Sequence, residues 1–151
     1  MQHGGRWTNI ILAAHGKLAP GVVDAANLVF GQIDHLDVVT FEPGQNAETL
    51  KKKYHEIIDP LAADEEILFL VDLFGGSPYN AAFEVAANQE RMDIITGLSL
   101  PMLIDVIGLR TMNEEIKAQE VYESLGKDTY IKSCKNMLKA NAAEAEEEDE
   151  L

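Results

Sequence analysis

Four short apolar runs alternate with segments of helical periodicity, and this alternation restricts the fold more than any other feature of the chain. The runs are residues 8–15, 36–41, 67–71 and 92–97. Each is followed by a segment in which apolar residues recur every three or four positions, as on one face of a helix. Strands that alternate with helices in this way form a parallel sheet with right-handed crossovers. We therefore expect an α/β protein, and 151 residues suit one domain with one core.

The expected helix starts come from residues that favour the first helical turn or the position before it. They are Pro20, Asn46, Ser77 with Pro78 after it, Pro101 and Asn113. Gly31 and Gly126 mark the expected ends of the first and last of these helices, because glycine accepts the left-handed conformation that commonly ends a helix. The sequence thus predicts a helix after every strand and one more near the C-terminus.

The C-terminal part of the chain is compatible with more than one structure. The segment 129–134 either extends a helix or forms an edge strand, since Thr, Tyr and Ile favour strands. From Ala140 onwards the chain is rich in alanine and glutamate and is expected to be disordered or loosely helical. The expected organisation is a disordered N-terminus or cloning remnant over residues 1–7, a folded domain over 8–135 and an acidic, poorly ordered tail over 136–151.

The chain is strongly acidic, with a formal net charge of −14 and six acidic residues among the last eight positions. The remainder is acidic too, which argues against a nucleic-acid partner, because such a partner requires a clustered basic face. A basic protein partner would be attracted to this surface. The lysine run 51–53 is expected to be a solvated helix face, with a patch for a partner protein as the alternative.

Several classes of protein are excluded by what the sequence lacks. No apolar run approaches the roughly 20 residues that span a bilayer, and the N-terminus lacks the layout of a signal peptide. We therefore expect a cytoplasmic protein. Cys134 is the single cysteine, so no intramolecular disulfide is expected. It has no partner at metal-site spacing, and we expect neither a metal nor a cofactor.

The first apolar run ends on His15, which is followed by Gly16. In parallel α/β sheets, ligands bind at the carboxyl ends of the strands. A helix is expected to begin shortly afterwards, and the free N–H groups of a helix N-terminus bind anions such as a phosphoryl group. His15 is therefore a candidate catalytic residue and Gly16 a candidate phosphate-binding residue. The alternative is that His15 is a hydrogen-bonded residue at a strand end with no chemical role.

The third apolar run ends on Asp72, and Gly75, Gly76 and Ser77 follow. A flavodoxin-like strand order of 2-1-3-4 would make the first and third strands neighbours and would bring Asp72 beside His15. Asp72 could then accept a hydrogen bond from one ring nitrogen of His15 while the other nitrogen attacks a phosphoryl group. Ser77 and the backbone at Gly75 and Gly76 are the candidates for binding the phosphoryl oxygens.

Three functions are compatible with these residues. In a phosphoryl carrier, His15 would take a phosphoryl group that arrives already activated, since the chain has no Walker loop, dinucleotide motif or Mg²⁺ carboxylate cluster. In a serine hydrolase, Ser77 would be the nucleophile, His15 the base and Asp72 its orienting partner, but the second glycine of the nucleophile elbow is missing. The third is a flavodoxin-like module that binds a ligand or a partner without covalent chemistry.

Four motifs resemble the enzyme IIA component of the mannose family of the bacterial phosphoenolpyruvate-dependent sugar phosphotransferase system. They are residues 14–21, 41–44, 68–80 and 97–103, and the resemblance covers roughly residues 8 to 135. It implies that His15 receives a phosphoryl group from the histidine-containing phosphocarrier protein and passes it to enzyme IIB. Asp72 matches the family's aspartate beside the active histidine, and Ser77 matches its phosphate-contacting serine.

The same resemblance implies how the protein assembles. The family forms homodimers in which a C-terminal strand of each subunit completes the partner's sheet, and Thr129–Cys134 is the candidate for this fifth, antiparallel edge strand. The membrane would be reached only indirectly, through the enzyme IIC/IID permease. No enzyme IIB domain follows, so we expect a free-standing IIA protein or a fragment of a fused one.

A related branch of the family is the phosphotransferase-fed subunit of dihydroxyacetone kinase, which shares the histidine region. The segments 75–78 and 100–103 favour the sugar-transport branch.

Overall fold

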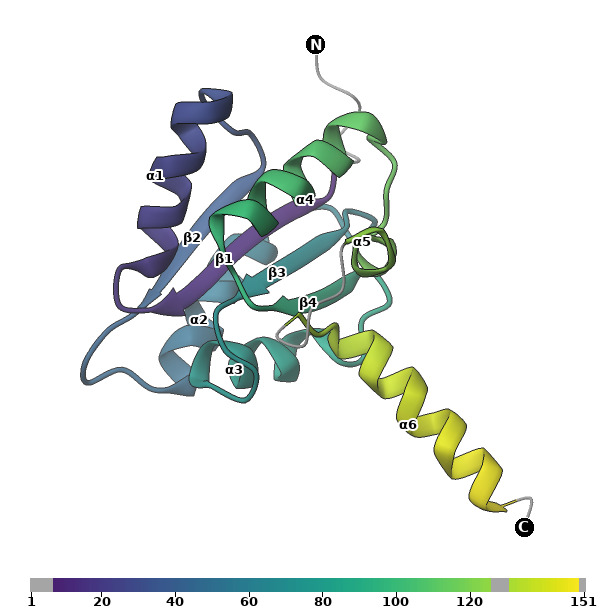
Figure 1. Cartoon of the computed structure of the whole chain (residues 1–151). Coiled ribbons are helices and arrows are strands. Elements are labelled where there is room, and N and C mark those ends of the chain that lie inside the picture. Colours follow the sequence, from purple (N-terminus) through teal and green to yellow (C-terminus); the bar gives the residue numbers. More distant parts are fainter. Residues whose placement is uncertain (1–6, 126–130, 150–151) are drawn as a thin grey trace.

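The computed structural model describes residues 7–125 and 131–149, which form an α/β structure around one parallel sheet (Figure 1). The strands are β1 (Asn9–His15), β2 (Leu36–Phe41), β3 (Ile67–Val71) and β4 (Met92–Thr96). Their order is β2-β1-β3-β4, and the paired strands are all parallel. The expected fold class and strand order are therefore confirmed.

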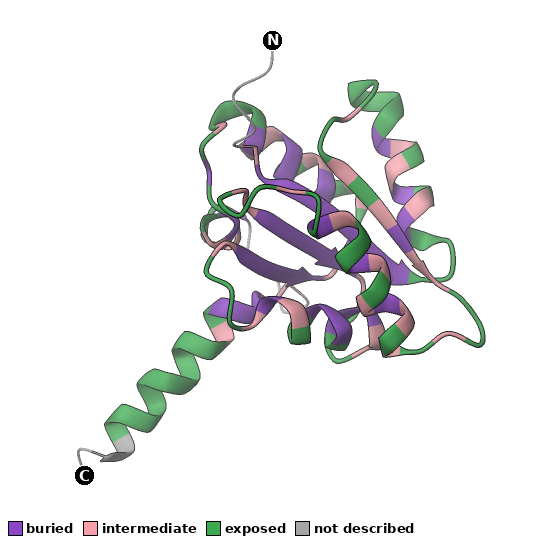
Figure 2. Ribbon diagram, turned by 180° about the vertical axis from the view of Figure 1, so that it is seen from behind, coloured by how far each residue is buried: buried purple, intermediate pink, exposed green. Residues whose placement is uncertain are grey.

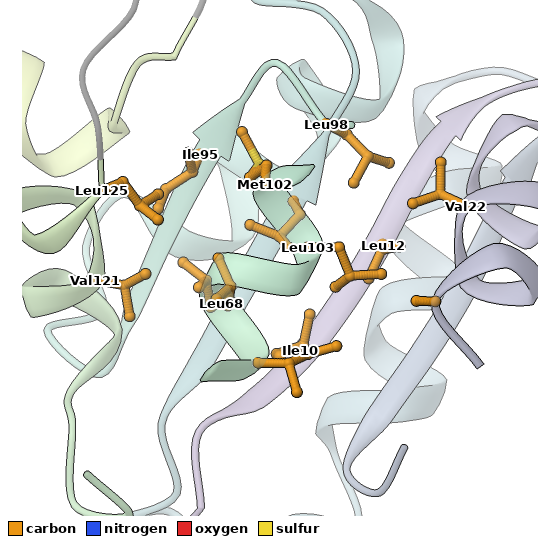
Figure 3. Packing of buried hydrophobic residues seen from close by; sticks show 14 of the residues in the cluster. Ile10, Leu12, Val22, Leu68, Ile95, Leu98, Met102, Leu103, Val121 and Leu125 are labelled. Atoms are coloured by element: carbon orange, nitrogen blue, oxygen red, sulfur yellow. The ribbon is translucent and has the colours of Figure 1, made fainter. Parts of the chain in front are cut away.

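Helices cover both faces of the sheet. They are α1 (Leu18–Phe30), α2 (Ala47–Ile58), α3 (Ser77–Ala86), α4 (Leu100–Met112), α5 (Ala118–Ser124) and α6 (Cys134–Asp149). Successive side chains of a strand point to opposite faces, so Ile10 and Leu12 of β1 pack with α1, α4 and α5 (Figure 3). Ile11 and Ala13 pack with α2 and α3 on the other face. The central strands are buried except at His15, the last residue of β1, whereas helices α1 to α5 expose one side (Figure 2).

Two of the expected helix starts are displaced by a residue or two. The first helix begins at Leu18, so Pro20 lies within its first turn, where a missing N–H costs nothing because first-turn N–H groups have no acceptor inside the helix. The third helix has Gly76 as its N-cap, so Ser77 is its first residue instead of its cap. The expected cap Asn46 is confirmed, since its side chain accepts a hydrogen bond from the N–H of Thr49.

The helix expected between Asn113 and Gly126 is present, but its expected start at Asn113 is wrong. Asn113 ends α4, and the next helix, α5, begins only at Ala118. The intervening chain crosses the amino edge of the sheet because Ile116 is buried there and its carbonyl accepts a hydrogen bond from the Thr8 hydroxyl. The carboxylate of Glu66, the residue before β3, then accepts a hydrogen bond from the N–H of Ala118 at 2.8 Å. Long-range contacts thus overrule the local capping signal, and the expected end at Gly126 lies outside the described residues.

The segment expected as a fifth strand is described from residue 131 onwards. Ser133 forms a single antiparallel bridge with Ile95 of the same chain, and the N–H of Thr96 donates to the carbonyl of Lys132 at 2.9 Å. Cys134 already belongs to α6, which runs continuously to Asp149 and extends away from the body (Figure 1). Of the two alternatives for the chain after Ala140, the structure contains the helix. Exchange of the edge segment between subunits stays a prediction.

Among the described residues, no helix has both the length and the apolar character that a membrane span requires.

Candidate active site at the carboxyl edge of the sheet

The structure brings together His15 and Asp72, which come from neighbouring strands. Ala13 of β1 is in register with Val71 of β3, so the next residues of both strands emerge at the same edge. Asp72 Oδ2 accepts two hydrogen bonds from His15, one from its backbone N–H at 3.0 Å and one at Nδ1 at 2.9 Å. The main chain and the ring of His15 are thus held by the same carboxylate oxygen.

The pairing leaves one nitrogen of His15 accessible. When Nδ1 carries the proton that it donates to the carboxylate, the lone pair of the neutral ring is on Nε2. The His15 side chain is 43% exposed, whereas that of Asp72 is only 11% exposed. The arrangement therefore presents a nucleophilic nitrogen to solvent and keeps its charge partner behind it.

Two neighbours hold the ring of His15 from the sides. The ring of Phe41, at the end of β2, meets it edge to face with centroids 5.6 Å apart. On another side, a Cβ atom added to Gly76 would lie 3.0 Å from His15 Cε1, so only glycine gives the ring its full space. The neighbouring Gly75 has a φ of 81°, a conformation that residues with a side chain rarely adopt.

The first turn of α3 lies beside this ring and carries no cap. The N-cap Gly76 has no side chain, and the first turn contains no acidic residue. Helix geometry leaves the first N–H groups without acceptors inside the helix, and Ser77 contributes both such an N–H and a hydroxyl. The turn that contacts His15 through Gly76 is therefore ready to bind an anion.

Gly16 follows His15 directly, in the turn between β1 and α1. Its N–H donates to the carbonyl of Phe41 at 2.8 Å, so that this donor is used within the fold. The structure therefore gives Gly16 a role in the turn, with its φ of 59°.

Helix α2 supplies two side chains that sequence reasoning did not single out for the site. Lys53 Nζ donates to the Thr40 carbonyl at 3.0 Å and so holds the end of β2. The Tyr54 hydroxyl donates to the carbonyl of Pro78, in the first turn of α3, at 2.9 Å. Lys53 departs from the expected solvated lysine face, whereas Lys51 pairs with Glu48 and Glu84 at the surface. No local signal marks these roles, because each partner is distant in sequence.

The geometry separates the remaining chemical alternatives. A serine nucleophile would need a hydrogen bond to the histidine that activates it. The side chains of Ser77 and His15 are both described, and no hydrogen bond joins them; the ring of His15 is bonded to Asp72 instead. Within residues 7–125 and 131–149, no group of three His, Cys, Asp or Glu side chains could hold a metal ion. The pair formed by His15 and Asp72 beside an open helix N-terminus is suited to nucleophilic attack on a phosphoryl group.

Known proteins resemble this chain over most of its length. The chain matches the EIIA-man family, described as "PTS system fructose IIA component", over residues 9–126. It is 38% identical over 102 residues to the PTS system fructose-specific EIIA component of Bacillus subtilis (strain 168), a match that covers 68% of this chain and 70% of that protein. This chain belongs to the mannose family of enzyme IIA proteins.

Further relatives agree with this assignment. The IIA chain is 36% identical over 101 residues to the PTS system mannose-specific EIIAB component of Escherichia coli (strain K12), which covers 67% of the chain but only 31% of that longer protein. The PTS IIA protein associated with the fucose utilization operon from Streptococcus pneumoniae has a similar structure, with a TM-score of 0.67 and 27% identity, over 83% of this chain and 96% of that one. The IIA chain is accordingly a phosphotransferase component that carries phosphoryl groups in sugar uptake.

Proposed function

We propose that Nε2 of His15 accepts a phosphoryl group from the histidine-containing phosphocarrier protein in the cytoplasm and passes it to enzyme IIB. The observation that carries this proposal is the hydrogen bond between His15 Nδ1 and Asp72, which leaves Nε2 as the exposed nucleophile. Family membership supports the two partners, because enzyme IIA components act between them.

The transfer needs no group that the chain lacks. The Nε2 lone pair attacks phosphorus in line with its bond to the donor's ring nitrogen. The new P–N bond forms as the old one breaks, and the donor's ring leaves as a neutral imidazole. His15 keeps its Nδ1 proton and becomes positively charged, and the carboxylate of Asp72 stabilises that charge. The Ser77 hydroxyl and the first-turn N–H of α3 hold the phosphoryl oxygens.

The decisive experiment measures intact mass after incubation with phosphoenolpyruvate, enzyme I and the phosphocarrier protein. Wild type should gain a single acid-labile phosphoryl group, and His15→Ala should gain none. His55→Ala is a matched control, because His55 also pairs with an aspartate, Asp59, at 3.2 Å, but on the exposed face of α2. A phosphoryl group on His15→Ala, or none on wild type with active upstream proteins, would refute the assignment.

The homodimer with exchanged edge strands belongs to the same proposal. At its outer edge β4 meets the short segment 132–135 of the same chain, through the bridge between Ile95 and Ser133, the hydrogen bond from the Thr96 N–H to the Lys132 carbonyl and the one from Lys135 Nζ to the Met92 carbonyl. A longer strand from a partner subunit could replace these contacts along the edge. Light scattering should give a dimer for the whole chain and a monomer or aggregate after truncation before Thr129. A compact dimer after truncation would exclude strand exchange.

A further inference from the structure

Tyr54, on α2, contacts the first turn of α3, and its role is not accounted for by the pair formed by His15 and Asp72. The residue is fully buried, and its ring packs edge to face on Phe69 with centroids 5.0 Å apart. Its hydroxyl donates to the Pro78 carbonyl at 2.9 Å. The ring is thus fixed by the core, and its polar end is directed at the start of α3.

The start of α3 depends on such outside contacts because it has no cap of its own. Neither a capping side chain nor an acidic first-turn residue is present there. From within the loop, Asn80 Nδ2 donates to the Gly75 carbonyl at 3.0 Å. The Tyr54 hydroxyl ties the first turn of α3 to helix α2.

Tyr54 also lies within the electrostatic field of the catalytic pair. Burial raises the pKa of Tyr54, and the negative charge of Asp72 raises that pKa further. Asp72 Oδ1 is itself buried and, among the described residues, without a hydrogen-bond partner. The phenol therefore remains a neutral donor, and its hydroxyl is available to hold Pro78 at every pH at which the protein works.

We propose that Tyr54 is a positioning residue for phosphoryl transfer, which fixes the first turn of α3 relative to His15 through its hydrogen bond to Pro78. This inference rests on the proposed function of His15. A displacement of the phosphoryl-binding turn by a fraction of an ångström misplaces Ser77 with respect to the attacking Nε2, and rates are sensitive to such shifts.

The test compares Tyr54→Phe with Tyr79→Phe. The first variant keeps the ring on Phe69 and removes only the hydroxyl. The second also removes a phenolic hydroxyl in the same layer, but one that lies beside the thiol of Cys134 instead of a backbone carbonyl. Both should fold and melt cooperatively, since each loses at most one hydrogen bond, worth about 1 kcal/mol.

Transfer from the phosphocarrier protein should separate the two variants. For Tyr54→Phe we expect kcat to fall about 10-fold with KM for the phosphocarrier protein unchanged, because only the turn beside His15 shifts. The ³¹P resonance of the phosphohistidine should move as well. Tyr79→Phe should match wild type in all three readouts. A wild-type kcat and ³¹P resonance in Tyr54→Phe, or equal changes in both variants, would overturn the proposal.

A second measurement keeps this inference separate from the function of His15. Inorganic phosphate is titrated into the unphosphorylated proteins while the amide resonance of Ser77 is followed. Tyr54→Phe should bind phosphate several-fold more weakly than wild type and Tyr79→Phe. If wild type accepts no phosphoryl group, the proposed function fails, yet the titration still decides whether Tyr54 positions the turn. Equal phosphate affinity in all three proteins would count against it.

Discussion

The two edges of the sheet treat their polar groups in opposite ways. At the amino edge, Arg110 is only 3% exposed and donates to the carbonyls of Thr8, Asp34 and His35 at 2.6–3.0 Å. At the carboxyl edge, His15 is substantially exposed and the first turn of α3 is uncapped. The amino edge uses its hydrogen-bonding groups to hold the fold together, whereas the carboxyl edge keeps donors and a nucleophile for a ligand. Substitutions should therefore affect stability at the first and transfer at the second.

The largest expected effect is on stability, from Arg110→Met. The variant removes the guanidinium that three carbonyls share, the buried carbonyl of Thr8 among them, which should lower the free energy of unfolding by about 3 kcal/mol in urea denaturation. Burial lowers the pKa of Arg110 to about 10, so the guanidinium stays charged near neutral pH. Its Nε has no partner among the described residues, which offsets part of the stabilisation.

Arg91→Met is the control for that change. Arg91 Nη1 donates to the Ala62 carbonyl at 3.0 Å near the same edge but is only half-buried, so its loss should cost under about 1 kcal/mol. Neither variant should change the transfer rate per folded molecule. If Arg110→Met lost transfer activity while remaining folded, the assignment of stability to the amino edge and of transfer to the carboxyl edge would be wrong.

Asp72→Asn should slow phosphoryl acceptance about 100-fold, as measured by rapid quench with labelled phosphocarrier protein. The amide oxygen of asparagine can still accept from the backbone N–H and from Nδ1 of His15, but the negative charge that stabilises the phosphorylated, positively charged ring is lost. The thermal midpoint should change little. Asp59→Asn, which alters the exposed pair with His55, should transfer normally. Wild-type rates in Asp72→Asn would mean that this carboxylate is only structural.

Gly76→Ala should slow transfer about 10-fold by displacing the ring of His15, which the new Cβ would approach at 3.0 Å. The reaction can be followed in the same rapid-quench assay. Gly108→Ala serves as control, because its added Cβ has nothing within 4 Å. Alanine there should leave transfer unchanged and raise helix stability slightly. If both alanine variants transfer at the wild-type rate, the ring has more freedom than the structure indicates.

The smallest effect concerns Asp93, on β4, whose pKa is raised by burial although Ser133 and the N–H groups of Ile94 and Lys135 stabilise its charge. The folded protein holds this proton more tightly than the unfolded chain, whose value is 3.8. Stability from this group is therefore full below that pH and is lost as pH rises through the raised pKa.

Asp93→Asn should remove this dependence. The free energies of unfolding of wild type and Asp93→Asn are measured in urea at several pH values from acidic to neutral. The value for wild type should fall relative to that of the variant as the pH rises. A difference independent of pH would show that Asp93 is not protonated preferentially in the folded state.

The sequence sufficed to predict the sheet and the contact between His15 and Asp72, and for a shared reason. Each apolar run ended at a recognisable point, so strand order alone brought His15 to Asp72. Residues whose partners are distant in the chain escaped prediction. Tyr54 was recognisable only as a core position, and its hydroxyl reaches Pro78 across 24 residues. The predicted helix start at Asn113 was wrong because the burial of Ile116 outweighed the local capping signal.

Helix α6 has a consequence for the electrostatics of the site. It leaves the body at Cys134 (Figure 1), and at about 1.5 Å per residue the acidic run that starts at Glu144 begins about 15 Å along the helix. In physiological salt the Debye length is about 8 Å. Counterions therefore screen the carboxylates of Glu144, Glu146 and Glu147 from His15. These acidic residues contribute to the charge of the protein but lie beyond electrostatic reach of the site, where Asp72 is the carboxylate in contact with the histidine.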